Sequence, residues 1–91
     1  MSKIKDLGAG RWYWRGVVNG RSREAWASVD LGSMQVEFVE EPLHPEAKRH
    51  EGGGARYSVA RFRRGDGAGW NRHHSALYAA VCAYLEEHVP D

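Results

Sequence analysis

The sequence predicts an α+β domain in which an antiparallel β-meander of three to four strands packs one face against one C-terminal helix, giving two layers. Two turn signals, Asn19-Gly20 and Gly32-Ser33, separate segments in which apolar and polar residues alternate. Towards the C-terminus, the alternation gives way to apolar residues spaced three to four apart, which is typical of an amphipathic helix.

Length and composition are those of one soluble domain. A chain of 91 residues has room for one hydrophobic core, so residues 1–91 are expected to form a single domain. No apolar run approaches the ~20 residues that span a bilayer, and MSKIKDLGAG lacks the apolar segment of a signal peptide. The single cysteine, Cys82, excludes an intrachain disulfide and a cysteine-based zinc site. These features predict a cytoplasmic protein.

The two turn signals determine which side chains share a face of the sheet. A type I′ turn at Asn19-Gly20 sets Trp14 opposite Ala25 and Tyr13 opposite Trp26. A type II′ turn at Gly32-Ser33 sets Trp26 opposite Val39. The face predicted as core comprises Trp12, Trp14, Ala25, Ala27, Val29, Leu31, Met34, Val36 and Phe38. The other face comprises Arg11, Tyr13, Arg15, Glu24, Trp26, Ser28, Asp30, Glu37 and Val39.

The rest of the chain supplies a loop, a fourth strand and the helix. Residues 42–54 hold two prolines and three consecutive glycines, and they are predicted to form a flexible loop. The segment ARYSVARFRR, residues 55–64, is predicted as a strand that ends at GDGAG, residues 65–69. The helix is expected to begin near Asn71 or Ser75, either of which can serve as its N-cap. Its apolar stripe comprises Leu77, Ala80, Val81, Tyr84 and Leu85.

The face opposite the predicted core is the candidate binding surface. Tyr13, Trp26 and Val39 line up across three strands there, with Arg11 and Arg15 beside them. Exposed aromatic residues with charged neighbours are typical of interaction surfaces. Three occupants stay open: a separate partner, another part of the chain, or a second subunit of a homodimer.

Charged residues occur in blocks, although the net charge is only +1. Residues 1–23 hold six basic residues and one acid, whereas residues 24–51 hold seven acids and two basic residues. Such a surface of two signs suits a charged protein partner, unless the blocks lie together in the fold and neutralise each other. The predicted partner-binding set joins the aromatic face to an acidic edge; it comprises Arg11, Tyr13, Arg15, Trp26, Glu37, Glu40 and Glu41.

A second basic segment, residues 56–74, supports an alternative function. Arginines near a tryptophan can contact phosphates while the indole stacks on a base. In this alternative the protein is a small β-sheet domain that binds nucleic acid through Arg61, Arg63, Arg64, Trp70 and Arg72. The same arginines can instead pair with the acidic residues or lie at a solvated strand end.

No residue pattern indicates catalysis, a cofactor or a metal. The five histidines lack the spacing of zinc ligands, and Cys82 has no Cys-His-Asn set around it. The runs GGG and GDGAG lack the lysine or acidic partner of a phosphate-binding loop. We therefore expect a protein without enzymatic activity, cofactor, metal or membrane contact.

Two family resemblances bear on the function. The stretch GRWYWRGVVNGRSREAW, residues 10–26, resembles the opening of the DNA-binding arm domains of phage integrases, which place a helix after a three-stranded sheet. That resemblance implies binding to DNA. The acidic third strand and the net charge of +1 depart from the pattern, and both weaken binding to phosphates.

The second resemblance is one of size and layout. With a small antiparallel sheet closed by a helix such as SALYAAVCAYLEEH, the chain is similar to anti-CRISPR proteins of phages and mobile elements. This similarity implies a non-enzymatic inhibitor, monomeric or homodimeric, in the cytoplasm of a bacterial host. It implies that the protein binds a CRISPR effector subunit or complex and blocks its handling of nucleic acid by steric and electrostatic occlusion. We expect this function, with the nucleic-acid-binding domain as the alternative.

Overall fold

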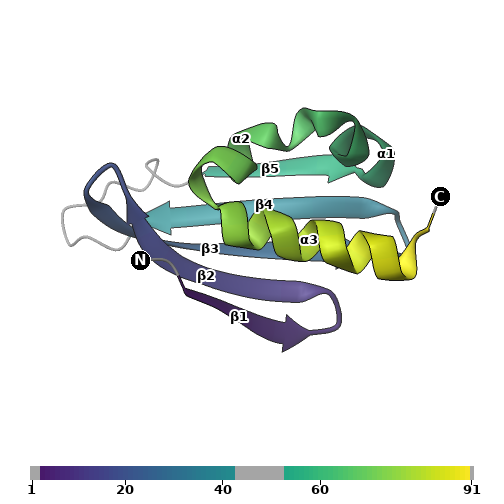
Figure 1. Cartoon of the computed structure of the whole chain (residues 1–91), viewed down its shortest axis with the longest axis horizontal. Helices are drawn as coiled ribbons and strands as arrows, with labels where there is room; N and C mark the ends of the chain where they lie inside the picture. The colour runs from purple at the N-terminus through teal and green to yellow at the C-terminus, as the bar shows by residue number, and fades with distance from the viewer. Residues whose placement is uncertain (1–2, 43–52, 91) are drawn as a thin grey trace.

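The computed structural model describes residues 3–42 and 53–90. Their strands form one antiparallel sheet in which every strand pairs with its neighbour in the chain (Figure 1). The strands are β1 (Lys3–Gly8), β2 (Arg11–Val18), β3 (Arg21–Asp30), β4 (Gln35–Pro42) and β5 (Gly53–Ser58). The helical segments all follow β5: α1 (Val59–Arg61), the π-helical η2 (Phe62–Asp66), α2 (Ala68–His73) and α3 (Ser75–His88).

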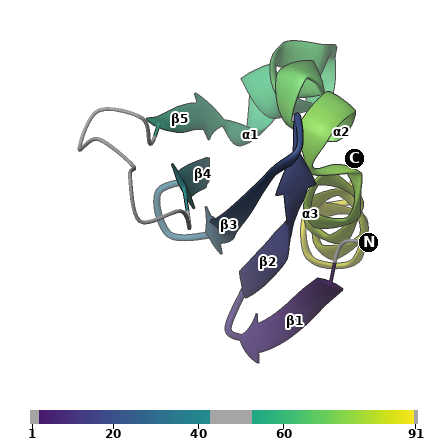
Figure 2. The same cartoon turned by 90° about the vertical axis from the view of Figure 1, so that its left-hand side faces the viewer.

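The helical segments form a second layer on one face of the sheet (Figure 2). The predicted α+β class with an antiparallel sheet is therefore confirmed, whereas the helical layer comprises α1, η2, α2 and α3 in place of the one C-terminal helix predicted. The sheet has five strands among the described residues, whereas the sequence predicted three or four. We call the face that packs against the helical layer the covered face and the opposite one the open face.

The registers predicted from the two turns are correct. Trp14 pairs with Ala25 and Tyr13 with Trp26 across β2 and β3, and Trp26 pairs with Val39 across β3 and β4. Each indole on the covered face thus lies opposite an alanine, which leaves space for the ring between the sheet and the helices. Trp12 and Trp14 are buried, as predicted.

The turn between β3 and β4 differs from the prediction. It is a four-residue connection from Leu31 to Met34, not a two-residue type II′ turn. The Asp30 carboxylate accepts hydrogen bonds from the backbone N–H groups of Gly32 and Ser33 at 2.9 and 3.2 Å, and Met34 takes a positive φ of 55°. This aspartate-stabilised turn keeps the register but leaves Leu31 and Met34 exposed, so their assignment to the core was wrong.

Strand β1 was not predicted. It pairs with β2, with Lys3 opposite Arg15 and Lys5 opposite Tyr13. All its residues are exposed, because β1 lies at the edge of the sheet. A strand that buries no side chain gives only a weak alternating signal in the sequence.

The segment 55–64 is a strand only as far as Ser58, so the prediction of a strand to Arg64 was wrong. The Ser58 hydroxyl caps the following turn by accepting a hydrogen bond from the Arg61 N–H at 3.2 Å. Val59 and Phe62 are both buried. Their spacing of three residues is the helical period, which places both side chains on one side of a helical turn.

Helix α3 packs the predicted stripe against the sheet. Leu77, Val81 and Leu85 are buried in it, and Tyr84 makes an edge-to-face contact with Trp12 at 5.4 Å between ring centroids. Neither proposed N-cap residue caps this helix: Asn71 lies inside α2, and Ser75 is the first residue of α3. The residue before α3 is His74, which is buried.

None of the helices that the structure describes is long and apolar enough to cross a membrane. Most of the loop predicted over residues 42–54, namely residues 43–52, lies outside the described residues.

Candidate interaction surface

The open face has no helix over it in the described part of the chain (Figure 2). Residues that lie opposite each other in neighbouring strands point to the same side, so the registers define this face. Its members include Lys3, Lys5, Arg11, Tyr13, Arg15, Glu24, Trp26, Ser28, Glu37, Val39, Glu41 and Arg56. Six of the seven predicted partner-binding residues are thus on one surface.

The centre of the open face is aromatic and half-buried. The rings of Tyr13 and Trp26 lie 5.6 Å apart and are tilted by 58°. The Tyr13 hydroxyl donates a hydrogen bond to Glu24 Oε2 at 2.9 Å. This bond to a carboxylate raises the pKa of Tyr13, because it stabilises the protonated phenol. The tyrosine is therefore held in place as a neutral donor.

Beside the aromatic pair lies a shallow hollow of about 330 Å³. Leu7, Trp26 and Val39 supply apolar lining, while Arg11 and Glu37 bring opposite charges to it. A hollow with an apolar lining and two charges of opposite sign can accept a side chain from a partner and hold its polar end.

The two halves of the open face carry opposite charge. Lys3, Lys5, Arg11 and Arg15 are exposed on β1 and β2, and no hydrogen bond or ion pair to another residue of the described ranges 3–42 and 53–90 engages their side chains. On β3 and β4 the carboxylates of Glu24, Glu37 and Glu41 face the same way. Arg56 on β5 pairs with Glu37 at 2.8 Å.

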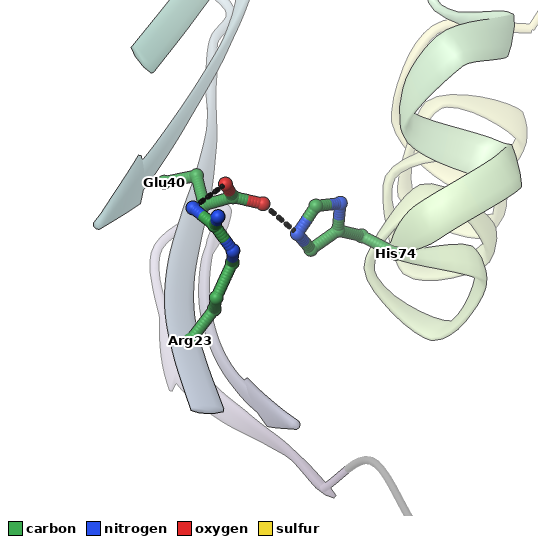
Figure 3. A network of polar contacts seen from close by, with 3 residues as sticks. All are labelled: Arg23, Glu40 and His74. Atoms are coloured by element: carbon green, nitrogen blue, oxygen red, sulfur yellow. Dashed lines mark hydrogen bonds and ion pairs between the residues drawn. The ribbon is translucent and has the colours of Figure 1, made fainter. Parts of the chain in front are cut away.

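Glu40 does not belong to this surface, so its prediction within an acidic edge was wrong. Alternation along β4 places Glu40 on the covered face with Val36 and Phe38. Its carboxylate receives Arg23 Nη1 at 2.9 Å and lies 2.5 Å from His74 Nε2. Figure 3 shows the glutamate between the arginine from β3 and the histidine that precedes α3.

His74 connects this network to the aromatic core. Its ring contacts Trp14 at 4.4 Å and Trp70 at 4.8 Å between centroids. Burial lowers the pKa of His74, and the neighbouring Glu40 opposes this effect. Because Arg23 already balances the Glu40 charge, burial favours a neutral imidazole, whose Nδ1 has no hydrogen-bond partner among the described residues. The Arg23–Glu40–His74 network therefore joins the two layers of the fold.

The residues of the alternative nucleic-acid site are spread over the helical layer. Arg61 pairs with Asp66 at 2.8 Å. Arg63 donates to the backbone carbonyls of Leu85 and Val89 at the end of α3. Trp70 is partly buried and stacks on Phe38 at 4.7 Å between centroids. Arg64 and Arg72 are exposed. Nucleic-acid binding by this set stays a prediction.

Other reactive side chains do not assemble into a site. Burial raises the pKa of the Cys82 thiol, and the nearby Glu86 adds to the effect, so the thiol is held protonated. Within residues 3–42 and 53–90, no group of three or more histidine, cysteine, aspartate or glutamate side chains is placed to hold a metal ion. His44 and His50 lie outside those ranges.

Sequence reasoning missed Lys3, Lys5 and Arg56 of the open face, and Leu7 of the hollow beside it. The two lysines recur at the period of a strand, but that signal is weak because no residue of β1 is buried. It also missed the partners of Glu40, because Arg23 and His74 approach only once the helical layer has packed on the sheet.

Comparison with protein-family models, with curated proteins and with solved structures finds no significant match for the chain.

Proposed function

We propose that the protein is a non-enzymatic binding protein that recognises a protein partner with the open face of its sheet. One observation carries the proposal: the half-buried Tyr13–Trp26 pair lies between four cations on β1 and β2, which have no ion pair within the described ranges, and the carboxylates of β3 and β4. An aromatic centre bordered by charges of both signs matches the anatomy of protein–protein interfaces.

The charge pattern favours a protein over nucleic acid. A phosphate backbone would be attracted by Arg11 and Arg15 but repelled by Glu24 and Glu41, one or two strands away. A protein surface can instead present charges of both signs in matching order. The partner we expect is therefore a protein with its own bipolar surface.

The most concrete form of this proposal is an inhibitor of the anti-CRISPR type. In that form the open face covers a moving or DNA-binding part of an effector complex and blocks it by occlusion. Trp26 is the central contact, because it lines the hollow and pairs with Tyr13.

A plaque assay tests the inhibitor. Expression of the protein in a CRISPR-immune strain should restore phage plaques, and Trp26→Ala should abolish the effect. The matched control is Leu31→Ala, which removes an apolar side chain that is exposed in the turn between β3 and β4, outside the proposed surface. The control should restore plaques as well as the original protein does. Unchanged plaque counts across several CRISPR types would exclude the inhibitor.

A gel-shift experiment separates the two classes of partner. Labelled duplex and single-stranded DNA should not shift at low salt if the partner is a protein. A shift that weakens steeply as salt rises would instead establish the nucleic-acid-binding alternative. In that case Arg15→Ala should weaken the shift if the open face is the contact surface, and Arg72→Ala should weaken it if the helical layer is.

A further inference from the structure

One row of side chains across the open face has a regular order of charge. The registers place Lys3 opposite Arg15, Arg15 opposite Glu24, and Glu24 opposite Glu41. Read from β1 to β4, this charged row carries two cations followed by two carboxylates. The row is antisymmetric about the line between β2 and β3.

We propose that this surface binds a second copy of the chain and that the protein forms a symmetric homodimer through its open faces. This inference rests on the proposed function, in which the open face is an interaction surface, and it names the partner. The twofold axis lies in the interface, parallel to the strands and above the line between β2 and β3. Rotation about this axis places an identical sheet face to face with the first. Each β2 then faces β3 of the second copy, and each β1 faces β4.

In this arrangement every charge of the row meets the opposite sign. Arg15 faces Glu24 of the second copy, and Lys3 faces Glu41 of the second copy. The symmetry repeats both contacts, so four ion pairs form at one level of the interface. Neither Lys3 nor Arg15 has a hydrogen bond or ion pair to another residue in the described ranges, so both are available for these contacts.

The neighbouring row supplies the apolar contact. Lys5, Tyr13, Trp26 and Val39 follow each other across the same strands. The axis passes between Tyr13 and Trp26, so each Tyr13 faces Trp26 of the second copy. Four aromatic rings then gather at the centre of the interface, where such residues contribute most to affinity. The ion pairs lie beside them, where they determine the orientation of the two copies.

The size of the face is adequate for a dimer. The axis leaves β5 outside the overlap, so the contact comprises four strands about 4.8 Å apart and about eight residues long, rising about 3.3 Å each, or roughly 500 Å² in projection. This is somewhat under a tenth of the total accessible surface of 5978 Å², close to the share that a standard interface takes from a small protein. Aligned packing of two sheets rotates them by about 30°. The rotation displaces the outer Lys3–Glu41 contacts more than the inner Arg15–Glu24 contacts.

Charge reversal tests the arrangement by sedimentation velocity over a range of protein concentrations. The unchanged protein should sediment as a dimer, with a dissociation constant that rises with salt. Lys3→Glu with Arg15→Glu makes the whole row acidic, and Glu24→Lys with Glu41→Lys makes it basic. Each double variant should dissociate at least about tenfold more readily. A one-to-one mixture of the two variants should restore a dimer, now a heterodimer that native mass spectrometry identifies by its mass.

The controls use charges on the helical layer. Arg72→Glu and Glu87→Lys reverse exposed side chains on α2 and α3, and both should dimerise as the unchanged protein does. Glu24 accepts the Tyr13 hydrogen bond, so circular dichroism must show that its variant is folded. If it is not, the single variants Lys3→Glu and Glu41→Lys repeat the mixing experiment with a smaller effect.

Two results would overturn the inference. One is a monomer at all concentrations up to the millimolar range. The other is a dimer that both reversed variants retain, or that their mixture fails to restore. Neither result removes the proposed function: if Trp26→Ala still abolishes plaque restoration, the open face binds a foreign protein. If the dimer forms as described but plaques never appear, the surface is a homotypic one and the inhibitor is excluded.

Discussion

The two faces of the sheet are built from the same strands, but their charged side chains have different surroundings. On the covered face, Glu40 is shared between Arg23 and His74, so its charge is balanced inside the fold. On the open face, Arg11 and Arg15 have no such bond among the described residues, and the aromatic pair remains half-exposed. The comparison teaches that burial, and not residue type, separates the residues of the core from the candidate binding residues. Trp14 and Tyr13 are adjacent in sequence and fall into different classes.

The largest effect is expected when one tryptophan on each face is replaced by alanine. Trp14 is 2% exposed, and Trp14→Ala should lower the free energy of unfolding by about 3–5 kcal/mol, because it leaves a large cavity. Trp26→Ala should cost about 1 kcal/mol, the worth of a contact between exposed aromatic rings. Urea unfolding followed by circular dichroism measures both. Equal losses would mean that the two faces are wrongly assigned.

A second test uses neighbouring glutamates on opposite faces. Glu40→Ala leaves Arg23 and His74 without their shared acceptor, and it should lower the free energy of unfolding by about 2–3 kcal/mol, since the pair is largely shielded from solvent. Glu41→Ala removes an exposed carboxylate and should change it by less than about 0.5 kcal/mol. Thermal unfolding at neutral pH compares the two variants. A stable Glu40→Ala protein would show that the network does not hold the layers together.

The third test is the pH dependence of stability, a smaller effect. His74 faces Glu40 from β4, Arg23 from β3 and His73 from α2. Burial lowers its pKa in the folded protein below the ordinary value of 6.5, so the unfolded chain binds the proton more readily. Stability should therefore be complete above pH 6.5 and fall as the pH drops below that value.

The control for this pH effect is His74→Gln, which cannot titrate. Its unfolding midpoint, measured between pH 7.5 and 5.5, should change less with pH than that of the unchanged protein. A parallel decline in both proteins would assign the pH dependence to other groups.

The smallest effect is expected from Tyr13→Phe. The change removes the hydrogen bond to Glu24 but keeps the ring against Trp26, so it should cost about 0.5–1 kcal/mol. It also leaves the Glu24 carboxylate available to a partner's cation, so the variant can lose stability without losing binding. Urea unfolding measures the change in stability, and sedimentation velocity measures the change in binding. A loss as large as that of Trp14→Ala would place Tyr13 in the core.

Much of the sheet could be predicted because its information is local. Asn19-Gly20 specified the first hairpin, and alternation then assigned Trp12, Trp14, Tyr13 and Trp26 to their correct sides. The type of the turn after Asp30 was predicted wrongly, but the register of β3 and β4 was predicted correctly, since two different turns can join the same pair of strands. Alternation alone placed five of the seven predicted partner-binding residues on the open face, namely Arg11, Tyr13, Arg15, Trp26 and Glu37.

The features that could not be predicted depend on contacts between segments that are distant in the sequence. The sequence around His74 does not indicate that it is buried, because apart from Trp70 its partners come from distant strands, Trp14 from β2 and Glu40 from β4. Glu40 was grouped with Glu41 by proximity, although the strand period already placed them on opposite faces. The helical turn at 59–66 was hidden by strand-forming residues before it, while the spacing of Val59 and Phe62 was the signal that could have shown it.

The order of the strands also bears on how the chain folds. Because every ladder joins strands that are consecutive in sequence, the sheet has short loops to close and can form early. Helix α3 follows all five strands in the chain, yet its Tyr84 packs against Trp12 on β2. During synthesis, the sheet is therefore complete before its apolar side has a cover. We expect this interval to be the time at which the nascent chain is most prone to aggregate.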